Sequence, residues 1–296
     1  MAAFTLRGTF TALVTPFSEA DGSIDFPAYE RHLEAQIAGK IHGLVPCGTT
    51  GESPTLSEQE KFELVQRSVK VAAGRAFVMA GIGANDTKKA VHQAQAAAEA
   101  GADAVMLLMP PYSRPSQAGL ADYVEQVASA VQLPVVIYNI PGRTAVSLEV
   151  DTLIEAAARS SNVVGLKDAT GNVQYCQNLL ARVGGRLSVL SGDDALTLPM
   201  MAVGARGVVS VTSNVLPAAV GKVVQAALDG KFDLARAEHL RLLAVHEAMF
   251  CAPSPGPVKV ALAERGAMCA RLRPPMDLPT PGQRARIVAA LQIFES

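Results

Sequence analysis

One pattern of polar and apolar positions recurs along the chain. A stretch with helical periodicity ends in small residues and glycine, and a short apolar run follows, as in the segments 37–48, 99–110 and 202–213. Glycine just after a helix adopts the left-handed conformation that ends the helix at little cost. The apolar runs are too continuous for strands with one face in water, so they predict parallel strands covered by helices.

Similar apolar runs fill the intervals between these segments, at 9–17, 76–84, 133–141, 162–170 and 187–195. The chain therefore has about eight candidate strands at intervals of roughly 25–35 residues. A helix is expected over 87–100, because it follows the capping sequence Asn85-Asp86-Thr87. About eight strand–helix units in about 220 residues predict an α/β fold, a (βα)8 barrel of the TIM type.

A doubly wound parallel sheet is the alternative that the same alternation allows. Such a sheet more often carries a GxGxxG turn that opens a helix, and the segment GIGAND at 81–86 lacks the third glycine. The barrel is therefore the favoured fold.

The strand pattern stops near residue 221. The segments 221–250, 257–269 and 281–294 are typical of helices, and proline-rich segments separate them. We therefore expect a catalytic barrel over 1–220 and a helical C-terminal extension over 221–296, which packs on the barrel and is not a second catalytic domain.

Composition and charge exclude several classes of partner. The 296 residues carry a net charge of −1 without any block of like charge, so we expect no nucleic acid or membrane as partner. The first ten residues lack the parts of a signal peptide, and the densest apolar run, at 104–111, is too short to span a bilayer. The four cysteines are widely spaced, which is typical of free thiols in the cytoplasm, and no spacing indicates a metal site.

The first candidate for chemistry is a lysine at the end of a predicted strand. Lys167 ends the apolar run 163–166 and directly precedes Asp168. It is either a structural lysine, extended to solvent or paired with Asp168, or a Schiff-base lysine. Active sites of such barrels lie at the carboxyl ends of the strands, and a dry site disfavours the ammonium, so a neutral amine can attack a carbonyl group. The iminium then stabilises a neighbouring carbanion, so we expect neither a metal nor an organic cofactor.

Other predicted strand ends carry groups suited to a small acid. In GTTGE at 48–52, backbone N–H groups can hold a carboxylate, although such a turn is also typical of a capped helix start. Tyr112 and Tyr138 follow predicted strands, where a phenol either completes a hydrogen bond at a core edge or transfers protons beside an amine. Arg143, in the loop NIPGRT, is either a surface arginine or a bidentate clamp for a carboxylate.

Together these segments resemble a known family. GTTGE, YNIPGRT, GLKDATG, SGDDA and GVVSVTSN occur in the order and at the spacing of the pyruvate-dependent class I aldolases of the N-acetylneuraminate lyase superfamily. The resemblance covers nearly the whole chain, from about Gly8 to the last predicted helix. Five motifs in register are far more specific than one of them alone.

The resemblance implies a set of catalytic residues. Lys167 would form a Schiff base with pyruvate, and Tyr138 would donate and accept protons beside it. Thr50 would link Tyr138 to Tyr112 in a hydroxyl relay. Members usually supply that second tyrosine from a neighbouring subunit, so the resemblance also implies a homotetramer or a homodimer.

The resemblance implies substrate-binding residues as well. The backbone amides of Thr49 and Thr50 would bind the pyruvate carboxylate, and Gly192 and Val209 would line the pocket through backbone atoms. Arg143 would bind the carboxylate of L-aspartate 4-semialdehyde. The branch that acts on long sugar acids generally lacks PGRT, so we favour the branch that condenses pyruvate with this semialdehyde on the way to diaminopimelate and lysine.

Two other functions stay open at this point. One is another pyruvate-dependent 2-oxo acid aldolase or dehydratase of the same superfamily, which would share Lys167 and Tyr138. The other is a non-catalytic protein that binds a small acid as a sensor, which the joint presence of Lys167, Tyr138, Thr50 and Tyr112 disfavours.

The chain departs from the pattern of that branch at two places. The segment SPGPVK at 254–259 often reads NPIPVK in relatives, and we expect it to lie away from the catalytic positions. Relatives that lysine inhibits carry a histidine, a glutamate and a further tyrosine at positions that here hold Glu58 and Lys61, Lys89, and Pro111. Because Lys89 would repel a cationic effector, we predict weak or absent inhibition by lysine.

Overall fold

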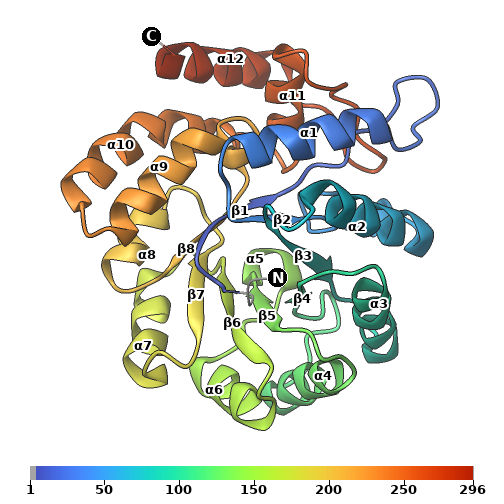
Figure 1. Cartoon of the computed structure of the whole chain (residues 1–296), viewed down its shortest axis with the longest axis vertical. Helices are drawn as coiled ribbons and strands as arrows, with labels where there is room; N and C mark the ends of the chain where they lie inside the picture. The colour runs from blue at the N-terminus through green and yellow to red at the C-terminus, as the bar shows by residue number, and fades with distance from the viewer. Residues whose placement is uncertain (1–4, 296) are drawn as a thin grey trace.

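Eight apolar runs of the sequence form strands in the computed structural model, which describes residues 5–295. The strands are β1 (Gly8–Ala12), β2 (Gly43–Val45), β3 (Phe77–Ile82), β4 (Ala104–Leu108), β5 (Val135–Asn139), β6 (Val163–Asp168), β7 (Ser188–Ser191) and β8 (Gly207–Ser210). Neighbours in the chain pair in parallel, and β1 pairs with β8, so the sheet closes into a barrel (Figure 1). The predicted (βα)8 fold is confirmed, and the doubly wound alternative is excluded because its sheet is open. Two parts of the chain lie outside the described residues. They are residues 1–4, the start of the segment without signal-peptide features, and Ser296, the end of the expected extension.

Helices follow the strands and surround the barrel (Figure 1). They are α1 (Phe26–Ala38), α2 (Glu58–Ala72), α3 (Thr87–Glu99), α4 (Gln117–Ser129), the short α5 (Pro141–Thr144), α6 (Val150–Arg159), α7 (Val173–Val183), α8 (Thr197–Ala202) and α9 (Pro217–Leu228), with the 3-10 helices η1 (Ser53–Thr55) and η2 (Thr212–Asn214). The helix expected over 87–100 is α3. It begins where the sequence predicts, because the Asp86 side chain accepts hydrogen bonds from the N–H groups of Lys88 and Lys89.

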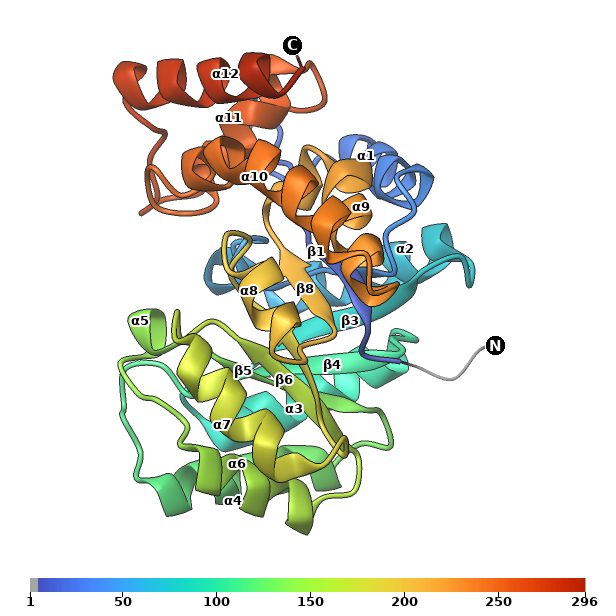
Figure 2. The same ribbon diagram turned by 90° about the vertical axis from the view of Figure 1, so that its left-hand side faces the viewer.

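Three more helices lie outside this ring on one side of the barrel. They are α10 (Phe232–Ala248), α11 (Gly256–Glu264) and α12 (Pro281–Glu295). The helix α10 packs on α8 and α9, and α12 packs on α10 and α11 (Figures 1 and 2). The helical segment expected over 221–250 is divided near Gly230, whose φ is +73°, and the expected boundary at residue 220 falls within α9. Within residues 5–295, no helix is both long and apolar enough to cross a membrane.

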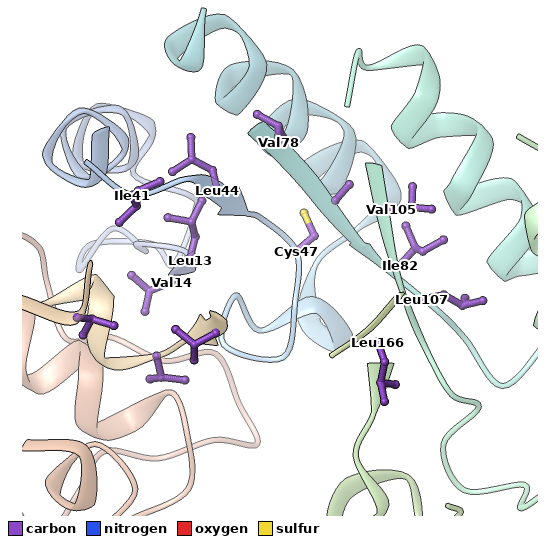
Figure 3. Close-up of a cluster of buried hydrophobic side chains, with 14 of the residues drawn as sticks. Leu13, Val14, Ile41, Leu44, Cys47, Val78, Ile82, Val105, Leu107 and Leu166 are labelled. Carbon is purple, nitrogen blue, oxygen red and sulfur yellow. The ribbon is translucent and has the colours of Figure 1, made fainter. Parts of the chain in front are cut away.

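The strand side chains alternate between two apolar layers. The inner layer fills the barrel and includes Phe10, Val45, Met79, Val136, Tyr138 and Val209. The outer layer lies between the strands and the helices, as Figure 3 shows around Leu44, Val78 and Val105. Both layers are buried, which explains why the strands read as continuous apolar runs.

All eight strands end at the same rim of the barrel, because they are parallel. Figure 2 shows α5, which follows β5, at the end of the barrel opposite the N-terminus. The turn GTTGE follows β2 and the loop after β4 carries Tyr112, so these polar segments gather at this rim.

Candidate active site

The orientation of Lys167 is set by an irregularity in its own strand. The strands β5 and β6 pair in register except at Val164, which has no partner in β5 and is therefore an extra residue. Beyond this β-bulge Lys167 pairs with Tyr138, whose side chain belongs to the inner layer. Without the bulge Leu166, which lies in the outer layer (Figure 3), would take that place, and Lys167 would face the helices.

Glycine is required beside the bulge. A Cβ atom on Gly165 would lie 2.1 Å from the carbonyl oxygen of Ser188 and 2.5 Å from a methyl carbon of Leu6. Ser188 belongs to β7, so the backbones of β6 and β7 approach too closely for any side chain. The apolar run that ends on Lys167 therefore contains a glycine for a steric reason.

The Lys167 amine lies inside the barrel next to an aromatic ring. Its side chain is buried, and Nζ is 3.9 Å from the centroid of the Tyr138 ring. In the described part of the chain, no ion pair includes Lys167. Such an amine has no carboxylate that would hold it as an ammonium.

Asp168 does not pair with Lys167. Its side chain lies on the opposite face of β6, and Oδ1 accepts a hydrogen bond from the N–H of Thr170 at 2.9 Å. Burial raises the pKa of the Asp168 carboxyl, and the hydrogen bonds with Thr170 oppose that shift. The structural alternative of a Lys167–Asp168 ion pair is therefore wrong.

The GTTGE turn after β2 leaves two backbone amides free. The N–H of Gly51 donates to the carbonyl oxygen of Gly48, and the N–H of Glu52 donates to that of Thr49, each at 3.1 Å. Among the residues that the structure describes, the N–H groups of Thr49 and Thr50 have no acceptor. Two adjacent free amides form a site that suits a carboxylate.

The helix after this turn starts elsewhere. Its first residue is Glu58, and Ser57 caps it in a capping box with Glu60. The capped helix start that the sequence allowed as an alternative is therefore present after the turn, with Ser57 as its cap, and it does not use the two free amides.

A cavity of about 450 Å³ adjoins the turn and Tyr138, but Lys167 and Thr50 are not among the residues that line it. Its walls include Gly48, Thr49, Tyr138 and Arg143, together with Ser53, Glu58, Lys61, Asn85, Lys89 and Pro111. Cys47 also lines the cavity, but burial raises the pKa of its thiol to about 12. This thiol stays protonated at neutral pH and is not a nucleophile.

Arg143 is held at the mouth of the site by the C-terminal extension. Its Nη2 donates to the carbonyl oxygen of Ser254 at 3.4 Å. In the same segment, Lys259 pairs with Glu52 at 2.5 Å. The expectation that 254–259 lies away from the catalytic positions is therefore wrong.

The sequence alone does not identify Glu52 and Lys259 as partners, because 207 positions separate them in the chain. The signal that points to them is a charge within an apolar helix. Lys259 stands in the run GPVKVALAE, and a lysine buried among such residues needs a partner.

Tyr112 is not brought to this cavity. Its side chain is 88% exposed, and its φ of +72° is rare for a residue other than glycine. Among the described residues, no hydrogen bond joins Tyr112, Thr50 and Tyr138. One chain alone therefore does not complete the hydroxyl relay that the resemblance implies.

Gly192 lies just beyond the end of β7, and Val209 lies in the neighbouring strand β8. The N–H of Gly192 donates to the carbonyl oxygen of Asp168 at 2.7 Å, just beyond β7. Val209 is buried in the inner layer and pairs with Phe10 of β1. Gly192 therefore lies beside the end of β6, and Val209 belongs to the inner layer of the barrel.

Comparisons with known proteins agree with one another. The sequence profile described as the dihydrodipicolinate synthetase family matches residues 5–293. The chain is 51% identical over 296 residues to a 4-hydroxy-tetrahydrodipicolinate synthase of Sorangium cellulosum, with 100% of this chain and 98% of that protein covered. It is similar to the crystal structure of dihydrodipicolinate synthase from Aquifex aeolicus, with a TM-score of 0.95, 40% identity and 98% of each chain covered. It is also similar to the 4-hydroxy-tetrahydrodipicolinate synthase of Methylacidiphilum fumariolicum SolV, with a TM-score of 0.96, 41% identity, and 98% of this chain and 96% of that one covered.

The close approach at Gly165 predicts a large effect on stability. In Gly165→Ala the new methyl group collides with backbone, so we expect the free energy of unfolding to fall by about 3 kcal/mol. Denaturant titration measures this change. The matched control is Gly282→Ala, where a Cβ atom meets nothing within 4 Å and stability should be equal or higher. Equal stability of wild type and Gly165→Ala would contradict the steric argument.

Proposed function

Because the chain belongs to the dihydrodipicolinate synthetase family, we propose that it condenses pyruvate with L-aspartate 4-semialdehyde to 4-hydroxy-tetrahydrodipicolinate, a step toward diaminopimelate and lysine. As a member of this family, the chain is a lyase. The observation that carries the proposal is the buried Lys167 amine, which lies 3.9 Å from the centroid of the Tyr138 ring and has no carboxylate partner within residues 5–295.

In the first half of the proposed reaction, Lys167 takes up pyruvate. Its amine attacks the keto carbon, and loss of water from the carbinolamine gives an iminium. The hydroxyl of Tyr138 supplies a proton to the departing oxygen. The free amides of Thr49 and Thr50 hold the carboxylate of pyruvate, as adjacent backbone amides do for anions.

In the second half, the bound pyruvate becomes the nucleophile. The iminium loses a methyl proton to give an enamine, whose terminal carbon attacks the aldehyde carbon of the semialdehyde, and the new alkoxide takes up a proton. The semialdehyde's amine then replaces Lys167 at the former keto carbon, which closes the ring and frees the lysine. Arg143 binds the carboxylate of the semialdehyde in a bidentate geometry.

Further proposals concern the molecule as a whole. The exposure of Tyr112 supports a homodimer or homotetramer in which this residue completes the relay of a second subunit through Thr50 and Tyr138. Residues 221–296 act as an extension that supports the barrel. The four free thiols among the described residues support a location in the reducing cytoplasm.

The Schiff base can be tested by trapping. Borohydride reduction in the presence of pyruvate should attach the keto acid to Lys167, and peptide mapping by mass spectrometry locates the adduct. Lys259 is the internal control, because it is also buried but is paired with Glu52. Lys167→Met should lose the adduct and at least about 10³-fold in kcat. An adduct on Lys259, or none at all, would overturn the assignment.

The second substrate can be tested at Arg143. Arg143→Ala should lower kcat/KM for aspartate semialdehyde by about 10- to 100-fold, because a bidentate charged contact is lost. Its kcat/KM for pyruvate should be unchanged. Arg182→Ala serves as the control, since Arg182 pairs with Asp151 on the outside of the barrel. If Arg143→Ala keeps its activity with the semialdehyde, another 2-oxo acid aldolase or dehydratase becomes the better assignment.

The charges at the far end of the cavity predict the response to lysine. Lys61 lies 3.1 Å from Glu58, and the charge of Lys89 also helps to lower the pKa of Glu58. This end therefore offers no free carboxylate for the ammonium of an effector. We expect half-inhibition by L-lysine only above about 1 mM in a steady-state assay, and greater sensitivity in Lys89→Glu. Inhibition of the wild type at micromolar lysine would refute this prediction.

A further inference from the structure

The Glu52 carboxylate, at the end of the GTTGE turn, reaches into the C-terminal extension. It is buried, and Oε1 accepts a hydrogen bond from Nζ of Lys259 at 2.5 Å. Oε2 accepts a second one from the N–H of Arg273 at 3.0 Å. The backbone of Glu52 is left-handed, with a φ of +57° and a ψ of +37°, which is unfavourable for a residue with a side chain. The carboxylate contacts hold the turn in this conformation.

Lys259 is fully buried in α11 and has three partners. Besides Glu52, Nζ donates to the carbonyl oxygen of Arg271 at 2.8 Å and lies 4.1 Å from the centroid of the Phe17 ring. Burial lowers the pKa of Lys259 to about 8, and the charge of Glu52 opposes that shift. Removing two charges from water offsets much of the attraction between them, so a buried ion pair adds little net stability. The Lys259–Glu52 pair therefore matters mainly because it fixes the geometry of the turn.

The Glu52–Lys259 pair fixes the positions of the two free backbone amides, those of Thr49 and Thr50. The turn is anchored on one side by the hydroxyl of Thr15, which donates to the carbonyl oxygen of Gly51 at 2.7 Å. It is anchored on the other side by Glu52 and the extension. Thr49 and Thr50 directly precede these anchors, and hydrogen bonds weaken steeply when their angle changes. A small displacement of Glu52 would therefore misalign both amides.

The segment 254–259 of the extension also contacts Arg143, the residue proposed to bind the second substrate. Ser254, five residues before Lys259, accepts the hydrogen bond of Arg143 through its carbonyl oxygen. The segment 254–259 thus contacts Arg143, where the semialdehyde carboxylate is expected, and Glu52 in the turn whose amides are expected to bind pyruvate.

We propose that Glu52 and Lys259 are positioning residues, through which the C-terminal extension aligns the amides of Thr49 and Thr50 for the pyruvate carboxylate. The proposal rests on the proposed function, since it concerns the binding of that first substrate. Neither side chain touches substrate. Their effect on the reaction is exerted through the turn.

The decisive variant is the double substitution Glu52→Gln with Lys259→Met. Each single substitution leaves a buried charge or polar group without its partner and risks misfolding, whereas the double variant removes both charges at nearly constant volume. The matched control is Glu60→Gln. Glu60 pairs with Arg273 of the same extension at 2.6 Å, but it lies on α2 and not on the turn.

The readout is kcat/KM for each substrate, determined on variants whose thermal unfolding and elution on gel filtration match wild type. Pyruvate enters before the semialdehyde, so each value reports the capture of its own substrate. In the double variant we expect kcat/KM for pyruvate to fall by about tenfold, with kcat/KM for the semialdehyde within about twofold of wild type. Glu60→Gln should match wild type for both substrates.

Three outcomes would overturn the proposal. One is a folded double variant with wild-type kcat/KM for pyruvate, which would make the pair purely structural. A second is an equal fall for both substrates, and a third is the same fall for pyruvate in Glu60→Gln. Borohydride trapping on wild type separates these outcomes from failure of the proposed function, since a wild type without any pyruvate adduct would overturn the proposed function and the positioning role together.

Discussion

The extra residue Val164 in β6 decides which layer Lys167 enters. In a closed parallel barrel, each side chain points either into the barrel or toward the helices, and the side alternates along the strand. The bulge shifts this alternation by one residue, so that Leu166 joins the outer layer and Lys167 the inner one. Gly165 makes the shift possible, because the neighbouring strand leaves no space for a side chain there. The chemistry at the rim depends on this local change of register.

The acidic residues Asp168 and Asp194 of the nearby motifs hydrogen-bond to loop backbone and do not pair with the Lys167 amine. Asp168 binds the N–H of Thr170, and Asp194 accepts hydrogen bonds from the N–H groups of Val211 and Thr212 at 2.9 and 3.1 Å. Each carboxylate thus holds the chain at the end of a strand, β6 in one case and β8 in the other. The carboxylates of GLKDATG and SGDDA contribute to the site by fixing its walls. An ion pair with Lys167 would instead favour the protonated, unreactive form.

The sequence predicts most of what depends on local patterns. All eight strands and the start of α3 at Asp86 follow from apolar runs and capping residues. The direction of Lys167 could not be predicted, because the bulge is defined only by the pairing of β5 with β6. The tie between the turn and the extension was missed for a related reason, since no local pattern links residues so far apart in the chain.

The two buried lysines of this chain differ in the acceptors that surround Nζ. Both have Nζ close to an aromatic ring, at 3.9 Å from the centroid of Tyr138 for Lys167 and at 4.1 Å from that of Phe17 for Lys259. Burial and an aromatic neighbour therefore do not distinguish them. Lys259 has a carboxylate and a carbonyl oxygen as acceptors, and although burial lowers its pKa, the charge of Glu52 opposes that shift. Lys167 has no carboxylate partner among the described residues. The role proposed for Lys167 therefore rests on the absence, among the described residues, of a carboxylate that pairs with its amine.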